Sequence, residues 1–216
     1  MFGFPVLVEL AGRHVVVLGS LPVREGKVEA LVAGGADDVL VVASAPSARL
    51  EELAELDGVQ VERRRWRASD LDGAFLAIAH DPDPGVRAAM AREARRRHVM
   101  VNVVDDIPAC DWAMPSVVRR GDLLLAIGTG AASPALSKKL RERFEAEFGP
   151  EWAEVLRVLR EVREESLERL PAFPARAERW RAALDVDEAA ALAREGRADE
   201  LAARLRARLF EEAGAA

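Results

Sequence analysis

The chain has 216 residues, with 31 Lys or Arg against 37 Asp or Glu and a formal net charge of -6. This balance argues against general nucleic-acid binding, and the single cysteine, Cys110, excludes a disulfide framework and a cysteine-based zinc site. No apolar run approaches the roughly 20 residues that span a bilayer, and the amino terminus lacks the basic start of a signal peptide. We therefore expect a cytoplasmic protein without a membrane segment, built as one domain with an appendage or as two small domains.

The first 43 residues predict a strand, a turn, a helix and a second strand. The β-branched run His14–Leu18 has the form of a buried strand and ends at Gly19. Pro22 suits the first position of a helix, and the apolar run at 39–43 predicts the second strand. This order is the first half of a dinucleotide-binding unit.

The turn after the first strand lacks most of the usual G-x-G-x-x-G fingerprint. Only the first glycine, Gly19, is in place. The second strand is followed by Ser44 and Ala45 rather than by an acid that could hold a ribose hydroxyl. From these residues alone, nucleotide binding and a plain α/β core are equally open interpretations.

Alternating strand and helix patterns continue to residue 106 and predict a doubly wound parallel sheet. The expected elements are a helix at 49–56, an edge strand at 59–63, a strand at 75–79, a turn at 80–84, a helix at 86–97 and a strand at 101–104. The charged run Glu62–Arg67 is interpreted as a solvated face. Asp105 and Asp106 follow the last strand, at the end of the sheet where ligands of open α/β folds bind. Acids at such positions also serve as helix or turn caps, so both roles are open for Asp105.

The pattern then changes to a hairpin followed by helices. Met114–Val118 and Leu123–Ile127 are β-rich runs, and Arg119–Asp122 between them predicts an exposed basic tip. A two-stranded hairpin is marginal alone, so it must pair with the sheet or with a second subunit. Ser133 is expected to cap a helix at 135–148. Beyond it we expect a small helical bundle, with helices at 151–170, 175–184 and 187–213 and a break at Gly196.

Five blocks of the sequence together carry a family resemblance. They read FPVLVELAGRHVVVLG, FLAIAHD, VNVVDD, MPSVVRRGDLLLAIGTGAASP and LSKKLRERFE. In this order and spacing they resemble the amino-terminal module of siroheme synthase, which also occurs as a free-standing precorrin-2 dehydrogenase with or without sirohydrochlorin ferrochelatase activity. The resemblance runs from about Phe4 to Phe148. It implies a Rossmann-like NAD-binding domain at 1–112, a β-hairpin dimerisation region at 113–148, a helical domain at 149–216, and an intertwined homodimer.

The resemblance also implies a reaction, in which two hydrogens are removed from precorrin-2 with NAD⁺ to give sirohydrochlorin, followed in some members by insertion of Fe²⁺. Asp105 matches the aspartate that serves both steps. The implied cofactor-binding positions are Gly19, Ser20, Leu21, Pro22, Val23, Ser44, Ala45, His80 and Asp81. The substrate-binding candidates are Arg119, Arg120, Ser133, Lys138 and Lys139. The four basic residues among them could simply be solvated, but cations beside the active strand suit the carboxylates of precorrin-2. No residue is expected to hold a resident metal.

Two departures from the family pattern bear on the cofactor. The family loop G-G-G-x-V-A-x-R-K is here GSLPVREGK, so Leu21 and Pro22 add bulk and remove one backbone N–H where a pyrophosphate would lie. The usual A-T-D/N is here Ala79–Asp81. The alternative function is therefore a non-catalytic tetrapyrrole-binding paralogue, or a chelatase alone. The retained Asp105 favours the dehydrogenase.

Overall fold

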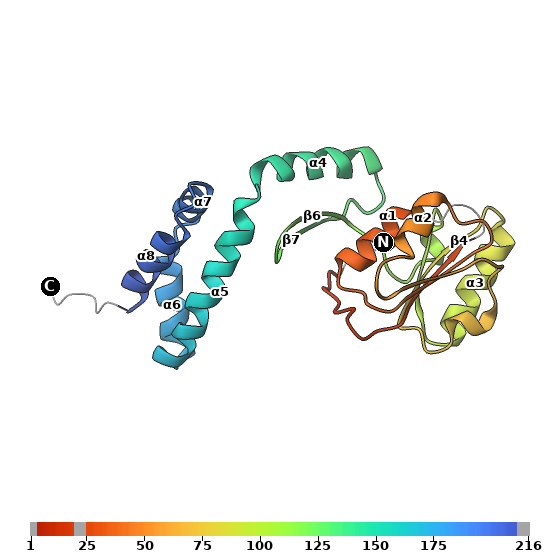
Figure 1. Ribbon diagram of the computed structural model, residues 1–216, viewed down its shortest axis with the longest axis horizontal. Coiled ribbons are helices and arrows are strands. Elements are labelled where there is room, and N and C mark those ends of the chain that lie inside the picture. The colour runs from red at the N-terminus through yellow and green to blue at the C-terminus, as the bar shows by residue number, and fades with distance from the viewer. Residues whose placement is uncertain (1–3, 20–24, 211–216) are drawn as a thin grey trace. The chain divides into compact units, whose positions relative to one another are not determined.

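The computed structural model describes residues 4–19 and 25–210. These residues form two compact units, which divide between Met114 and Pro115 (Figure 1). Each unit has hydrophobic clusters of its own.

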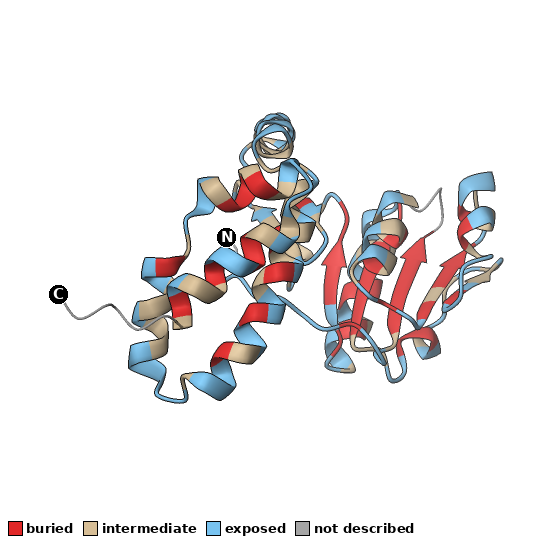
Figure 2. Ribbon diagram, turned by 60° about the vertical axis from the view of Figure 1, so that its left-hand side comes forward, coloured by how far each residue is buried: buried red, intermediate tan, exposed pale blue. Residues whose placement is uncertain are grey.

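The first unit is built on a five-stranded parallel sheet with the order β3-β2-β1-β4-β5. Its strands are β1 Val15–Gly19, β2 Val39–Ala43, β3 Val59–Glu62, β4 Leu76–His80 and β5 Met100–Val103. Every predicted strand of this unit forms within one or two residues of its expected bounds, and β3 lies at an edge as expected. The central strands are buried on both faces, which is why they read as continuous apolar runs (Figure 2).

Helices cover both faces of the sheet. These are α1 Glu25–Ala33, α2 Ala48–Leu53 and α3 Pro84–Arg96, with short 3-10 turns η1 Ala68–Leu71 and η2 Ile107–Ala109. One hydrophobic cluster joins Val15 and Val17 to apolar residues of α1 and α2, and a second joins Val16 and Leu18 to residues of α3. This alternation along β1 makes the sheet doubly wound and confirms the predicted α/β fold class.

The interpretation of Glu62–Arg67 as a solvated face is wrong for two residues. Arg64 donates to both carboxylate oxygens of the buried Asp70, at 2.8 Å each, and also pairs with Glu62. Trp66 packs against the second cluster of the sheet. A buried carboxylate needs a charged partner, and Arg64 provides it.

The second unit begins with an antiparallel hairpin of β6 Ser116–Arg120 and β7 Leu123–Ile127. Its turn consists of Gly121 and Asp122, and Arg119 and Arg120 belong to β6. The prediction that these two arginines form the tip of the hairpin is therefore wrong. The Arg120 guanidinium donates instead to the carbonyls of Phe148 and Glu145, at 2.8 and 3.1 Å. It thereby satisfies the otherwise free carbonyls at the end of the helix that follows the hairpin.

Helices fill the rest of this unit. They are α4 Pro134–Glu147, α5 Glu151–Arg169, α6 Phe173–Ala183, α7 Val186–Arg194 and α8 Ala198–Phe210. Helices α5 to α8 share one hydrophobic cluster, as expected for a small bundle. The chain breaks at Gly196, where φ is +72°, as predicted. Within the described ranges, no helix combines the length and the apolar character needed to cross a bilayer.

Candidate active site

The strand order places a topological switch point at the carboxyl ends of β1 and β4. The chain runs outward from β1 to β2 and β3, then returns to the other side of β1 for β4 and β5. This reversal is the topological switch point, where open α/β sheets bind ligands. Gly19 ends β1, is buried, and lies in register with Ala43 on one side and His80 on the other. The predicted loop residues Ser20, Leu21, Pro22 and Val23 lie outside the described residues.

A carboxylate from α1, which the sequence did not predict, lies beside the loop that follows β2. Ser44 and Ala45 follow the strand and are exposed. Ser47 accepts from the Leu50 N–H at 3.1 Å to cap α2, and its hydroxyl donates to Glu25 of α1. The hydrogen bond from Ser47 holds the pKa of the Glu25 carboxyl below its ordinary value. The sheet therefore has an acid beside the loop after β2, but it comes from α1 and so could not be found by looking after the strand.

At the end of β4, the imidazole of His80 has one ring nitrogen without a hydrogen-bond partner among the described residues. The side chain is half-buried, and its Nδ1 is buried without a hydrogen-bond partner among the described residues. The neighbouring Asp81 is buried and accepts from the Asp83 N–H at 2.9 Å. Asp83 in turn accepts from the Gly85 N–H at 2.7 Å and caps α3. Asp81 thus stabilises the turn, whereas Nδ1 of His80 makes no hydrogen bond to the described residues.

At the end of β5, Asp105 is exposed and has φ of +61°. This left-handed conformation is uncommon for a residue with a side chain, although Asp tolerates it better than most. Strained backbone of this kind concentrates at functional sites. The positive φ is a structural property of the predicted catalytic residue that could not be seen in the sequence.

Arg87 of α3 connects the loops that follow β4 and β5. Its Nη1 donates to the carbonyls of Asp81 and Pro82, at 2.7 and 3.2 Å. Its Nε lies 4.0 Å from a carboxylate oxygen of Asp106. Arg87 therefore braces the segment that carries Asp105 against the turn that follows His80. Sequence reasoning missed this residue, because nothing in a helical Arg indicates which loop it reaches.

A second device holds the Asp105 segment to the sheet, and it uses Cys110 and Asp111. The N–H of Val103 donates to Cys110 Sγ at 3.1 Å, and the thiol lies 3.1 Å from the Val103 carbonyl. The N–H of Asp111 donates to the Val101 carbonyl at 2.7 Å, while its carboxylate accepts from the Val101 N–H at 3.1 Å. Burial raises the pKa of the Cys110 thiol, so it remains a neutral donor. We call this stretch, residues 110–111, the β5 clasp.

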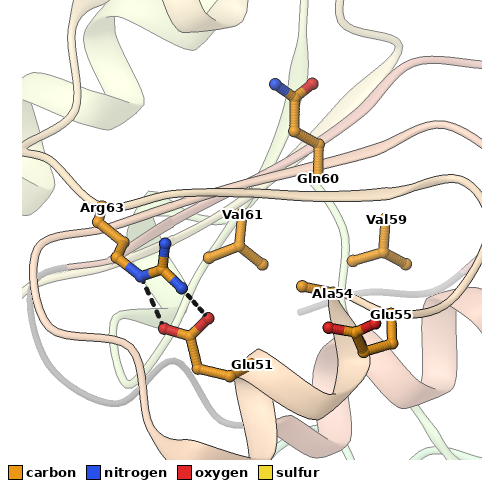
Figure 3. Close-up of a pocket in the computed structure, with 7 residues that line it drawn as sticks. All are labelled: Glu51, Ala54, Glu55, Val59, Gln60, Val61 and Arg63. Carbon is orange, nitrogen blue, oxygen red and sulfur yellow. Dashed lines mark hydrogen bonds and ion pairs between the residues drawn. The ribbon is translucent and has the colours of Figure 1, made fainter.

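A surface hollow lies elsewhere, between α2 and the edge strand β3 (Figure 3). Val59 and Val61 face it from the strand, whereas Gln60 points to the other side. Arg63 pairs with Glu51 at one end of it. Since β2 separates β3 from β1, this hollow does not lie at the switch point. No group of three or more His, Cys, Asp or Glu in the described ranges is arranged to hold a metal ion.

The predicted substrate-binding residues all belong to the second unit. Arg119, Lys138 and Lys139 are exposed, and Lys138 lies 3.8 Å from Glu142. Two of the candidates have structural roles: Arg120 contacts the end of α4, and the Ser133 hydroxyl accepts from the Leu136 N–H at 3.1 Å to cap its beginning. The grouping of these residues with Asp105 stays a prediction.

Comparison with known proteins identifies the family. Residues 6–116 match the family model described as "Putative NAD(P)-binding". "Siroheme synthase" from Methylococcus capsulatus is 34% identical over 196 residues, which are 91% of this chain and 41% of that protein. The chain belongs to the siroheme synthase amino-terminal module and precorrin-2 dehydrogenase family.

Other members of the family extend the comparison. "Siroheme synthase 1" from Yersinia enterocolitica is 40% identical over 147 residues, which cover 66% of this chain and 30% of that protein. The chain thus spans less than half the length of these siroheme synthases. The solved structure of "SirC, precorrin-2 dehydrogenase" has a TM-score of 0.61 and 22% identity, with 96% of this chain and 97% of that chain covered. At this identity the likeness shows the fold alone.

Proposed function

We propose that the protein removes two hydrogens from precorrin-2, with NAD⁺ as the acceptor, and releases sirohydrochlorin. The observation that carries the proposal is Asp105, an exposed carboxylate in strained backbone at the carboxyl end of β5. Membership of the precorrin-2 dehydrogenase family supports the substrate.

The switch point between β1 and β4 is the place where open α/β sheets bind dinucleotides. Gly19 has no side chain to obstruct close approach of a ligand at the end of β1. We assign NAD⁺ contacts to the predicted positions in the segments that end or follow β1, β2 and β4, which are Gly19, Ser20, Leu21, Pro22, Val23, Ser44, Ala45, His80 and Asp81. The ionised Glu25 beside the loop after β2 supports NAD⁺ over NADP⁺, because it would repel a 2′-phosphate.

In the proposed reaction the residues of the chain bind and orient the substrates, and one of them accepts a proton. NAD⁺ supplies the hydride acceptor when it is bound. Asp105 takes the proton that leaves the macrocycle, and the Arg87 brace and the β5 clasp hold its segment in place. The same carboxylate can accept pyrrole protons when Fe²⁺ enters sirohydrochlorin, which makes ferrochelatase the second candidate activity.

Anaerobic incubation of the protein with precorrin-2 and NAD⁺ tests the proposal. We expect NADH and sirohydrochlorin to appear in equal amounts. Each product is measured by its own absorption band. Sirohydrochlorin binding without NADH formation would instead support the tetrapyrrole-binding paralogue. Siroheme formation from sirohydrochlorin and Fe²⁺, with no dehydrogenation, would support a chelatase alone.

We further propose that residues 113–148 form the contact between two copies of the chain. The hairpin is a sheet of two strands only, and β7 is only partly buried by the unit to which it belongs. Helix α4 has no buried residue, and its Leu136 is an exposed apolar side chain. Isolated hairpins are marginal in water, so a second copy is the expected partner.

We therefore expect the protein to sediment as a dimer at micromolar concentration. Replacing Leu124 of β7 with Lys should shift it toward monomer, whereas Leu56→Lys, at an exposed site on the first unit, should not. A wild-type protein that sediments as a stable monomer at this concentration would contradict the dimer.

A further inference from the structure

Ile107 is an exposed apolar residue beside the proposed catalytic carboxylate. It follows Asp105 by two residues, and 48% of its surface is exposed. Single exposed apolar residues are ordinary on protein surfaces, so its position in the fold decides whether it has a role. In the described part of the first unit, the other large exposed apolar residues lie in segments that lead into β1 and β3 or begin β5, and they are Phe4, Val6, Leu7, Val8, Leu56 and Met100. Ile107 instead follows a strand, and it therefore lies at the carboxyl end of the sheet, where open α/β folds bind ligands.

The turn that carries Ile107 is held in place although none of its residues is buried. The turn is η2, and the Ile107 carbonyl accepts from the Cys110 N–H at 3.1 Å. The Ala109 carbonyl accepts from the guanidinium of Arg95, on α3, at 2.8 Å. Since the turn adds little to the core, these bonds mainly fix the direction in which its exposed side chain projects. A side chain that is already ordered loses little entropy when a ligand binds to it.

The length of the chain between Asp105 and Ile107 limits how far apart they can lie. Two residues span at most about 7 Å between their Cα atoms. A carboxylate that takes a proton from the macrocycle must lie at the ring, and a tetrapyrrole ring is wider than this span. A ring seated at Asp105 is therefore within reach of the Ile107 side chain.

The charge of this segment indicates which part of the ligand it meets. Precorrin-2 has apolar ring faces and carries its carboxylates at the periphery. Asp105 and Asp106 are both carboxylates, and like charges repel, so the periphery is disfavoured beside them. The apolar side chain of Ile107 matches the ring instead.

We propose that Ile107 packs against the apolar face of the tetrapyrrole and holds the ring beside Asp105. The inference rests on the proposed function, because the ligand is the substrate or product of that reaction. It adds an apolar contact to a site for which the other candidates, apart from Ser133, are cations that would bind the carboxylates.

Anaerobic titration with sirohydrochlorin, followed by quenching of tryptophan fluorescence, tests the contact in three variants. Ile107→Leu keeps a large apolar side chain and should bind within about twofold of the wild type. Ile107→Ser should bind about tenfold more weakly, because most of the apolar contact is lost. Ile107→Lys should also bind more weakly, since an ammonium group would face the ring. Tighter binding by Ile107→Lys would place the residue at the carboxylates and would overturn the inference.

Met100→Ser is the matched control, because Met100 is an exposed apolar residue at the opposite end of β5. It should leave sirohydrochlorin affinity unchanged. Because Ile107 is exposed, its variants should keep the thermal midpoint and the NAD⁺ affinity of the wild type, while the KM for precorrin-2 rises in Ile107→Ser.

The inference can fail separately from the proposed function. Equal sirohydrochlorin affinity of the wild type, Ile107→Ser and Ile107→Lys would overturn the inference and leave the proposed function standing. If Ile107→Ser kept this affinity but sedimented as a monomer, the residue would serve a contact between copies, and the inference would again be overturned. A wild-type protein that binds no sirohydrochlorin and forms none from precorrin-2 would overturn both.

Discussion

Replacing Asp105 with Asn should lower the rate of sirohydrochlorin formation by about 10²- to 10⁴-fold, the usual contribution of a positioned general base. Asn keeps the shape of the side chain and tolerates the φ of +61° at this position, but it cannot take a proton from the macrocycle. The rate of NADH appearance under saturating precorrin-2 and NAD⁺ measures the effect. Because Asp105 is exposed, we expect the thermal midpoint and NAD⁺ affinity to stay unchanged.

Asp106→Asn is the matched control, since it removes the adjacent carboxylate. Its side chain lies 4.0 Å from Arg87, so we expect a smaller loss of rate that comes from a looser segment. If Asp105→Asn retained activity within a few-fold of the parent, the proton would have another acceptor. Asp106 and His80 would then be the next residues to test.

Replacing Asp70 with Ala should destabilise the protein by about 3 kcal/mol, near the lower end of the range for breaking a buried ion pair. The substitution leaves the guanidinium of Arg64 partly buried, although it keeps Glu62 as a partner. Chemical denaturation at neutral pH measures the difference. Glu51→Ala breaks the exposed pair with Arg63 and should cost less than about 1 kcal/mol. An Asp70→Ala variant no less stable than Glu51→Ala would show that the Arg64 pair contributes little.

The contribution of Asp70 should also depend on pH. Burial alone would raise the pKa of this carboxyl, but hydrogen bonds from Arg64 and from the Arg67 N–H bring it below its ordinary value. The unfolded state therefore binds a proton at higher pH than the folded state does. The stabilisation is complete above the unfolded pKa of about 3.9 and is lost as the pH falls through the lower folded pKa. The difference between the wild type and Asp70→Ala should consequently shrink below about pH 4.

The elements that the sequence predicted well are those with a local cause. The β-branched run before Gly19 forms a central strand because its side chains suit burial on both faces. Gly196 ends a helix because it readily adopts positive φ. Asp105 could be placed at the end of its strand because the apolar run that predicts the strand stops directly before it.

The elements that the sequence missed depend on distant partners. Arg120 joins a strand rather than a turn, and it donates to carbonyls 25 and 28 residues further along the chain. Arg64 is drawn inward by Asp70, and Glu25 is placed beside the loop after β2 by Ser47. A run of charges has no pattern that distinguishes such partners from solvent. The contact between Glu25 and Ser47, which supports the proposed preference for NAD⁺ over NADP⁺, could not be predicted for this reason.

The β5 clasp has a consequence for how the sheet meets other chains. In a parallel ladder alternate residues face each neighbour, so Val101 and Val103 direct their backbone groups away from β4. Cys110 and Asp111 form hydrogen bonds with these backbone groups through a thiol, a carboxylate and one N–H. A foreign strand that approached this border would find no free donor or acceptor in either residue to pair with. Fibril-like growth of the sheet is therefore blocked beside Asp105, whereas the opposite edge of the sheet is formed by the short strand β3.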